Sequence, residues 1–197
     1  MAPVLLDLGP RLSHCGHATM ALHARKTTIT TRPEQPEDRA TVFEVNQLAF
    51  ARDHEARLVD RLRETAGPSN ISLVAEINKQ VVGHVLFSPI VIEGTNSQTK
   101  AIALAPLAVH PRYQYRGIGT TLVREGLTAC RRAGHRIVIV LGHPDYYSRF
   151  GFASATDRGV HPPFEIQPGA LMALELVPGS LAGVSGIVRY PPAFDEV

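Results

Sequence analysis

The spacing of apolar residues changes several times along the chain, and its first part predicts a strand followed by two helices. The stretch Thr27 to Arg32 is short and β-branched, and it ends before Pro33 and Pro36, which is typical of a strand. Apolar positions then recur every three to four residues in "EDRATVFEVNQLAF" and again in "EARLVDRLRET", as on one face of a helix. We expect these two helices to cover one face of a sheet.

Three apolar stretches of strand length come next, separated by short polar turns. They are "ISLVAEI", "VVGHVLFSPIVIEG" and "AIALAPLAV", and their order predicts a three-strand meander. Pro106 lies inside the third stretch. Because proline has no N–H to donate to a neighbouring strand, that strand must bulge or splay at this point.

The last third of the chain contains both helical spacing of apolar residues and short apolar runs of strand length. Apolar positions between Gly119 and Ala133 follow a helical period that stops at Gly134, so Cys130 is predicted to lie in the core. "RIVIVLG" predicts a buried central strand, "DYYSRFGF" a short helix and "ALMALELV" a late strand. We therefore expect an N-terminal extension over residues 1–26, a domain over 27–178, and a tail over 179–197 that packs on the domain.

Composition narrows the classes of function. The chain has 197 residues, of which 44% are hydrophobic and 19% charged, with a formal net charge of +2. The only lysines are Lys26, Lys79 and Lys100, so a basic surface that coats nucleic acid is not expected. No apolar run reaches the length of a membrane span. We expect neither nucleic acid nor a membrane as a partner.

The two cysteines, Cys15 and Cys130, form neither a disulfide framework nor a zinc-ligand pattern. This favours a reducing, cytoplasmic setting. The N-terminal extension also carries scattered histidines, which together with a cysteine could in principle bind a metal: His14, Cys15, His17 and His23. A second ligand set with the spacing of a structural site is missing, so we predict no metal.

One stretch, "HPRYQYRGIGTTL", has the character of an anion site. The dinucleotide fingerprint needs a third glycine where Leu122 stands, and a P-loop needs a lysine that is absent. What remains is a strand, a loop with Gln114 and Arg116, and then Gly117 and Gly119 at the start of a helix. Free N–H groups and the dipole of the first helical turn attract anions, although such a loop is by itself more often an ordinary turn.

The order V-x-P-x-x-Q-x-x-G-I-G, from Val109 to Gly119, resembles the acyl-CoA-binding motif of the GNAT superfamily of N-acetyltransferases. The resemblance extends over about residues 27–176. "LAPLAVHPRYQYRGIG", "VLGHPDYYSRFGF" and "GVSGIVRYPPAF" are similar to a bacterial branch of small predicted acetyltransferases. The resemblance implies an α/β protein of the α+β type. Its sheet would be mixed, mostly antiparallel and twisted, flanked by helices and splayed around its central strands.

The resemblance also implies where acetyl-CoA, the expected co-substrate, would bind. The pantetheine arm would pair with the main chain of Leu107, Ala108 and Val109. The pyrophosphate would lie on the following loop and helix start, with Arg112 as an additional charge: Gln114, Tyr115, Arg116, Gly117, Ile118, Gly119 and Thr120.

Three side chains are candidates for the chemistry. Tyr147 stands four residues before Gly151, where the superfamily commonly places a tyrosine near the CoA sulfur, and it could protonate the thiolate; its alternative role is a core aromatic. Glu55 and His84 are candidate bases, although a histidine in an apolar strand is more often a structural residue and an acid at a helix start is more often a partner of the helix dipole. His143 and deprotonation through water are further alternatives for the base.

These observations predict an acetyl-CoA-dependent N-acetyltransferase that moves the acetyl group to a primary amine of a small molecule or peptide by direct attack on the thioester. The alternative is a non-catalytic acyl-CoA-binding module. A homodimer is a further expectation. The sequence does not identify the amine.

Overall fold

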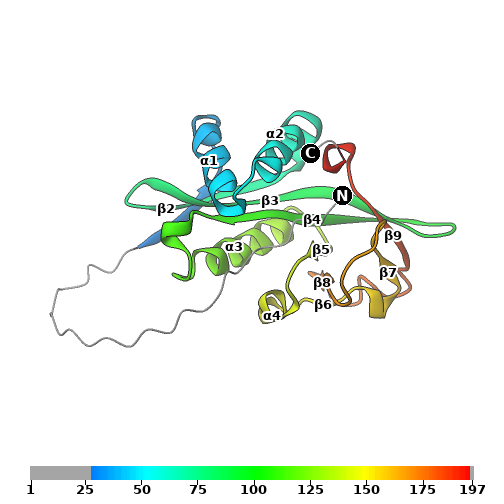
Figure 1. Ribbon diagram of the computed structural model, residues 1–197. Coiled ribbons are helices and arrows are strands. Elements are labelled where there is room, and N and C mark those ends of the chain that lie inside the picture. Colours follow the sequence, from blue (N-terminus) through cyan, green and yellow to red (C-terminus); the bar gives the residue numbers. More distant parts are fainter. Residues whose placement is uncertain (1–27, 196–197) are drawn as a thin grey trace.

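A long antiparallel hairpin forms the middle of the computed structural model, which describes residues 28–195 (Figure 1). Its strands are β3 (Gln80–Glu93) and β4 (Gln98–Val109). On the far side of β3 the sheet continues, again antiparallel, through β2 (Ile71–Ile77) to β1 (Ile29–Pro33). The predicted meander is therefore formed. The N-terminal extension lies outside the described residues.

Beyond β4 the sheet continues in the order β5, β8, β6. β5 (Ile137–Leu141) runs parallel to β4, whereas β8 (Leu171–Glu175) is antiparallel both to β5 and to β6 (Ala153–Ser154). In the C-terminal segment, β9 (Gly186–Arg189) pairs with the end of β3, and β7 (Val160–His161) pairs with β9. The sheet is thus mixed and mostly antiparallel, as expected, but the sequence pattern did not indicate β9.

Helices cover both faces of this sheet. α1 (Arg39–Phe50) and α2 (His54–Ala66) lie on one face, as predicted, and α3 (Ile118–Arg132) lies on the other (Figure 1). α4 (Pro144–Tyr147) is a single turn after β5. Short 3-10 helices connect these elements: Pro36–Asp38, Gly67–Ser69, Pro111–Tyr113, Ser148–Phe150, Thr156–Arg158 and Pro192–Phe194. Among residues 28–195, no helix is long and apolar enough to cross a membrane.

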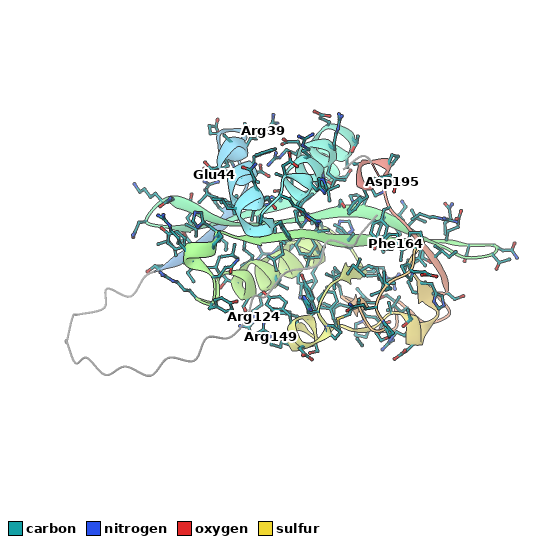
Figure 2. The ribbon with its side chains drawn as sticks, in the orientation of Figure 1. Arg39, Glu44, Arg124, Arg149, Phe164 and Asp195 are labelled. Carbon is teal, nitrogen blue, oxygen red and sulfur yellow. The ribbon has the colours of Figure 1, made fainter. Side chains whose placement is uncertain are left out.

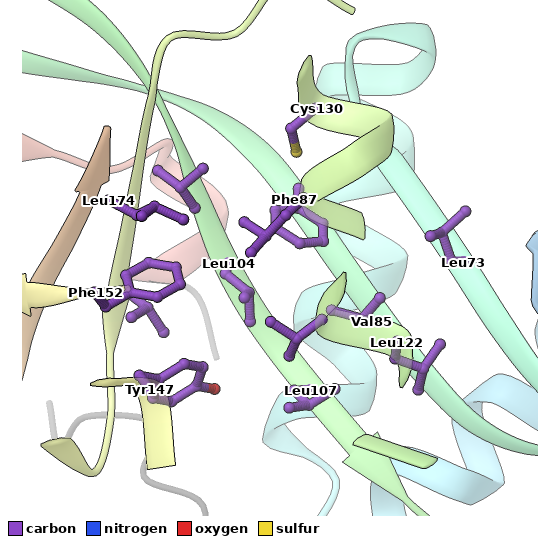
Figure 3. Packing of buried hydrophobic residues seen from close by; sticks show 14 of the residues in the cluster. Leu73, Val85, Phe87, Leu104, Leu107, Leu122, Cys130, Tyr147, Phe152 and Leu174 are labelled. Carbon is purple, nitrogen blue, oxygen red and sulfur yellow. The ribbon is translucent and has the colours of Figure 1, made fainter. Parts of the chain in front are cut away.

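The largest part of the core lies between α3 and the sheet (Figure 3). Leu122 and Cys130 of α3 pack there with Val85 and Phe87 of β3. Burial raises the pKa of the Cys130 thiol to about 12, so the residue behaves as a small apolar side chain. The prediction that Cys130 lies in the core is confirmed.

The sheet opens at the middle of β4. Val85 of β3 faces Leu107, but Phe87 faces Leu104, so two residues of β4, Ala105 and Pro106, oppose a single residue of β3. This is a β-bulge, as expected for a proline inside a strand. On its other edge, β4 pairs with β5 at only two positions, Ile102 and Ala103. From Leu104 onward, β4 and β5 are no longer paired.

The close approach of α3 to the sheet depends on a glycine. A Cβ atom at Gly126 would lie 2.2 Å from Cε2 of the buried Phe87 ring. Because a glycine inside a helix otherwise lowers its stability by about 1 kcal/mol relative to alanine, its presence here is explained by this contact with Phe87.

We therefore expect Gly126→Ala to lower the free energy of unfolding by about 1–3 kcal/mol, since the added methyl group must displace a rigid ring in a packed core. Urea denaturation measures this change. Glu125→Ala, on the exposed side of the same helix turn, is the control and should change stability by less than about 0.5 kcal/mol. A Gly126→Ala variant more stable than the parent would contradict the packing described here.

Candidate active site

The larger of two cavities that border β4 lies at the start of α3 and has a volume of about 550 Å³. It is bounded by the last residues of α1, by the end of β4, by the loop that leads into α3 and by the region of α4. The lining residues are Ala49, Phe50, Leu107, Val109, Tyr113, Gln114, Tyr115, Gly117, Ile118, Gly119, Thr120, His143, Asp145, Tyr146 and Arg149. We refer to it as the loop cavity. It contains most of the cofactor-binding residues that the resemblance implied.

The loop backbone is shaped to present main-chain N–H groups. Gly117 precedes α3 with φ of +83°, in the left-handed region, and a Cβ atom there would have no neighbour within 4 Å. The first helical hydrogen bond from this end is donated by the N–H of Thr121 to the carbonyl of Gly117. The N–H groups of the preceding turn therefore have no acceptor inside the helix, and they border an open space.

The side chains of the loop have different roles. Gln114 donates through Nε2 to the carbonyl of Val109 at 3.2 Å, which ties the loop to the end of β4. Arg116 lies over the Tyr113 ring, with its Cζ atom 5.4 Å from the ring centroid. Tyr115 is 79% exposed. Gln114 thus positions the loop, whereas Arg116 supplies a cation beside it.

A second cation lies in the wall of the loop cavity itself, whereas Arg116 is not among the lining residues. Arg149 lies over the Tyr146 ring, with Cζ 4.4 Å from the centroid, and both residues line the cavity. Together with the helix start, Arg149 and Arg116 favour an anion with several negative charges. The sequence reasoning missed Arg149, although its place in "YYSRFGF" next to Tyr146 and Tyr147 was a usable signal.

Tyr147 lies in the core at the opening of the sheet. Its ring packs edge-on against Phe152, at 5.7 Å between centroids, and a Cβ atom at Gly142 would lie 2.4 Å from it. Gly142 directly follows β5, so the ring adjoins the end of that strand. Its hydroxyl points toward Leu107 of β4 (Figure 3). Tyr147 therefore reaches from one separated strand toward the other, and burial raises its pKa above the ordinary value.

The second cavity, about 220 Å³ in volume, borders the same opening beside α2. Its walls come from α2 and the residues before it, β4, β5, the loop after β7 and the C-terminal segment. The lining residues are Arg52, His54, Glu55, Leu58, Ala103, Leu104, Ala105, Ile139, Leu141, Pro163, Phe164, Val188, Arg189, Tyr190, Phe194 and Asp195. We call it the aromatic cavity. Sequence reasoning did not find most of these residues, because they lie in segments far apart along the chain.

Glu55 lies in the wall of the aromatic cavity and is fully buried. Arg52 donates to both of its carboxylate oxygens through Nε, at 3.1 Å each. This contact raises the pKa of Arg52 above its ordinary value. A buried carboxylate is stable only with such a partner. Glu55 is thus a buried, paired carboxylate in the wall of the aromatic cavity, and its role as the base stays a prediction.

His84 lies elsewhere. Its Nδ1 accepts a hydrogen bond from Nδ2 of Asn46 at 3.1 Å, and its Nε2 lies 2.9 Å from Oγ of Ser72, to which it donates. Ser72 in turn donates to Glu34, which pairs with Arg63. Both ring nitrogens are engaged in this buried network, and His84 lines neither cavity. The geometry does not support His84 as the base.

Within residues 28–195, no group of three or more His, Cys, Asp or Glu side chains is placed to hold a metal ion. The histidines and the cysteine of the N-terminal extension lie outside the described residues. His143, the remaining alternative for the base, lines the loop cavity.

Comparison with known proteins identifies the family. Residues 30–155 match the model of the acetyltransferase (GNAT) domain. A curated relative, the uncharacterized N-acetyltransferase YhbS of Escherichia coli strain K12, is 36% identical over 166 residues, which are 84% of this chain and 98% of YhbS. The chain belongs to the GNAT acetyltransferase family.

Two solved GNAT structures share its fold. The crystal structure of E. coli YhbS in complex with CoA superposes with a TM-score of 0.80 at 32% identity and covers 91% of this chain and 96% of that one. A GNAT acetyltransferase from Brucella melitensis in complex with acetyl-CoA superposes with a TM-score of 0.70 at 35% identity. The match covers 86% of this chain and 99% of that one. The predicted superfamily, fold class and enzyme class, an acyltransferase of the GNAT type, are confirmed.

The buried His84 network makes the stability of this GNAT protein depend on pH. Burial lowers the folded-state pKa of His84 from 6.5, so the unfolded chain binds its proton first as the pH falls. We expect the free energy of unfolding to decrease below about pH 6.5, by up to about 1.4 kcal/mol per pH unit from this residue.

Urea denaturation between pH 5 and 7.5 tests this expectation. His84→Gln should lose the part of this slope that His84 contributes, which leaves the part from His135, whose pKa burial also lowers. His161→Gln, at an exposed histidine, should keep the whole slope. An unchanged slope in His84→Gln would mean that His84 is not the group that responds to pH.

Proposed function

We propose that this GNAT protein transfers the acetyl group of acetyl-CoA to a primary amine of a small molecule or peptide, by direct attack of the amine on the thioester. One observation carries the proposal. The loop cavity and the aromatic cavity both border β4, where β4 and β5 are no longer paired. An acyl donor held in the first cavity can therefore present its thioester to an acceptor held in the second.

In this proposal the loop cavity holds CoA. The pyrophosphate accepts hydrogen bonds from the main-chain N–H groups between Tyr115 and Thr120, and Arg116 and Arg149 add charge. The pantetheine arm follows β4 at Leu107, Ala108 and Val109. Support comes from the bulge before Leu107, from the two of these residues that line the cavity, Leu107 and Val109, and from the CoA and acetyl-CoA complexes of the two similar structures.

The reaction then needs two proton transfers. The amine nitrogen attacks the carbonyl carbon while a main-chain N–H at Leu107 or Val109 stabilises the oxyanion. The C–S bond breaks, and the departing thiolate takes the proton of the Tyr147 hydroxyl. Tyr147 lines neither cavity, and its support for this role is the direction of its hydroxyl, which points toward Leu107 of β4 (Figure 3).

We assign the proton lost by the amine nitrogen to Glu55, directly or through one water molecule. Glu55 is a buried carboxylate in the wall of the aromatic cavity, and Arg52 holds it in place. Oε2 accepts one hydrogen bond from Arg52, so its second lone pair can take the proton. We also propose that the protein works in the cytoplasm. That it forms a homodimer stays a prediction.

The phosphate site can be tested with two glycines of matched conformation at the two ends of α3. Gly117 has φ of +83° and Gly134 has φ of +82°, and a Cβ atom at either would have no neighbour within 4 Å. Valine at either position strains the backbone by about 1–3 kcal/mol. We expect Gly117→Val to weaken acetyl-CoA binding at least tenfold, because its side chain enters the loop cavity, and Gly134→Val to leave the affinity unchanged.

Isothermal titration with acetyl-CoA gives both affinities, and urea denaturation confirms that both variants fold. Equal affinities of Gly117→Val and the parent would remove the phosphate site from this loop. If the parent protein itself did not bind acetyl-CoA, this result would contradict the proposed function.

The proton donor can be tested with two neighbouring tyrosines. Tyr147→Phe keeps the packed ring and removes only the hydroxyl, so we expect kcat to fall by about a hundredfold with little change in acetyl-CoA affinity. Tyr146→Phe, whose ring lines the loop cavity, should change kcat only a few-fold. Thiol release followed across pH measures both. A Tyr147→Phe rate equal to the parent at every pH would exclude Tyr147 as the acid. Acetyl-CoA binding without thiol release on any amine would instead favour the non-catalytic module.

A further inference from the structure

The walls of the aromatic cavity narrow the chemistry of the amine that it accepts. Three rings form one side: Tyr190 lies 4.9 Å from Phe194 and 6.5 Å from Phe164, between ring centroids. Phe164 comes from the loop after β7, and the other two from the segment after β9. Burial raises the pKa of Tyr190 to about 12, so this phenol stays neutral. The rings provide an apolar surface that a flat or branched body can cover.

Much of the remaining wall of the aromatic cavity is also apolar. It includes aliphatic side chains of α2, β4 and β5, among them Leu58, Ala103 and Ile139. A sugar amine would have to bury several hydroxyl groups against these apolar side chains, and each hydroxyl left without a hydrogen-bond partner costs free energy. A polyamine would have to bury a second ammonium group there, which is more unfavourable still. An apolar body, by contrast, gains from the burial of its surface.

The charges at the aromatic cavity favour a cation over an anion. Its two arginines already have acidic partners: Arg52 pairs with Glu55, and Arg189 with Glu93. Asp195, labelled with Phe164 in Figure 2, is exposed and its carboxylate has no hydrogen bond or ion pair with any described residue. A carboxylate on the acceptor would thus meet arginines that are already paired, whereas an ammonium group is attracted by the Asp195 carboxylate.

The volume of the aromatic cavity limits the size of the acceptor body that it can enclose. Its volume of about 220 Å³ is below the roughly 300–1,000 Å³ of pockets that hold drug-sized ligands. Phe164, which is 37% exposed, lies in its wall and leaves part of its ring open to solvent.

We infer that the acceptor is a small primary amine carried on an apolar body about the size of one phenyl ring. This inference rests on the proposed function, since it names the substrate class of the same site. The body packs between the three rings and the aliphatic wall, and the amine reaches the opening between β4 and β5. A polyamine, a sugar amine or a peptide N-terminus matches these walls less well.

Thiol release with four acceptors at one pH tests the inference: 2-phenylethylamine, putrescine, glucosamine and triglycine. We expect kcat/KM for 2-phenylethylamine to exceed the other three by at least about tenfold. Phe164→Ala should lower that kcat/KM about tenfold, mainly through KM, with unchanged affinity for acetyl-CoA. Ile187→Ala, an exposed apolar residue of the adjacent β9 that does not line the cavity, is the control and should match the parent.

The outcomes separate the inference from the function on which it rests. If putrescine, glucosamine or triglycine were the best acceptor, the inference would be overturned while the proposed function stood. Calorimetric binding of 2-phenylethylamine to the protein with CoA, reduced in Phe164→Ala but without thiol release on any amine, would support the inference and contradict the proposed function. If 2-phenylethylamine were neither bound nor acetylated, the inference would be overturned.

Discussion

The loss of pairing between β4 and β5 is the constraint on which the rest of this structure depends. β4 can pair with β3 along its whole length only by bulging at Ala105 and Pro106, because proline cannot donate a ladder hydrogen bond. On its other edge it pairs with β5 only at Ile102 and Ala103. The sheet therefore separates at its middle, and main-chain groups of β4 beyond this point are available to a ligand.

Other features of the molecule fit around this opening. Gly142, directly after β5, has no side chain, so the Tyr147 ring can pack against the backbone there. The left-handed Gly117 starts α3 beside the far end of β4, and the N–H groups of the first helical turn border the loop cavity. On the α2 side, the C-terminal segment contributes Tyr190 and Phe194 to the aromatic cavity. The proposed donor and acceptor sites thus share one strand and are completed by different parts of the chain.

Local signals in the sequence predicted the parts of this arrangement that depend on local physics. Pro106 indicated the bulge because, wherever its strand lies in the sheet, proline cannot donate a ladder hydrogen bond. Gly117 and Gly119 before apolar residues with helical spacing indicated the open start of α3, because glycine allows the left-handed backbone found at Gly117. The aromatic cavity was not predictable in this way, because Glu55, Phe164 and Tyr190 meet only through tertiary packing.

His84 shows the limit of residue type as a guide. A histidine in an apolar strand can serve as a base or complete a buried network, and the choice depends on its partners. Here these are Asn46 from α1 and Ser72 from β2, and neither residue indicates from its sequence position that it will contact His84. Tyr147, by contrast, is the packed core ring that the sequence offered as one of two alternatives, and its role as the proton donor stays a proposal.

The most direct test of this account is a crystal structure of the protein with CoA. The account predicts the pyrophosphate on the N–H groups between Tyr115 and Thr120, the pantetheine arm along Leu107 to Val109, and the sulfur between β4 and β5 within hydrogen-bonding reach of the Tyr147 hydroxyl. A sulfur atom placed away from the opening, or a pyrophosphate bound elsewhere than at the start of α3, would contradict it.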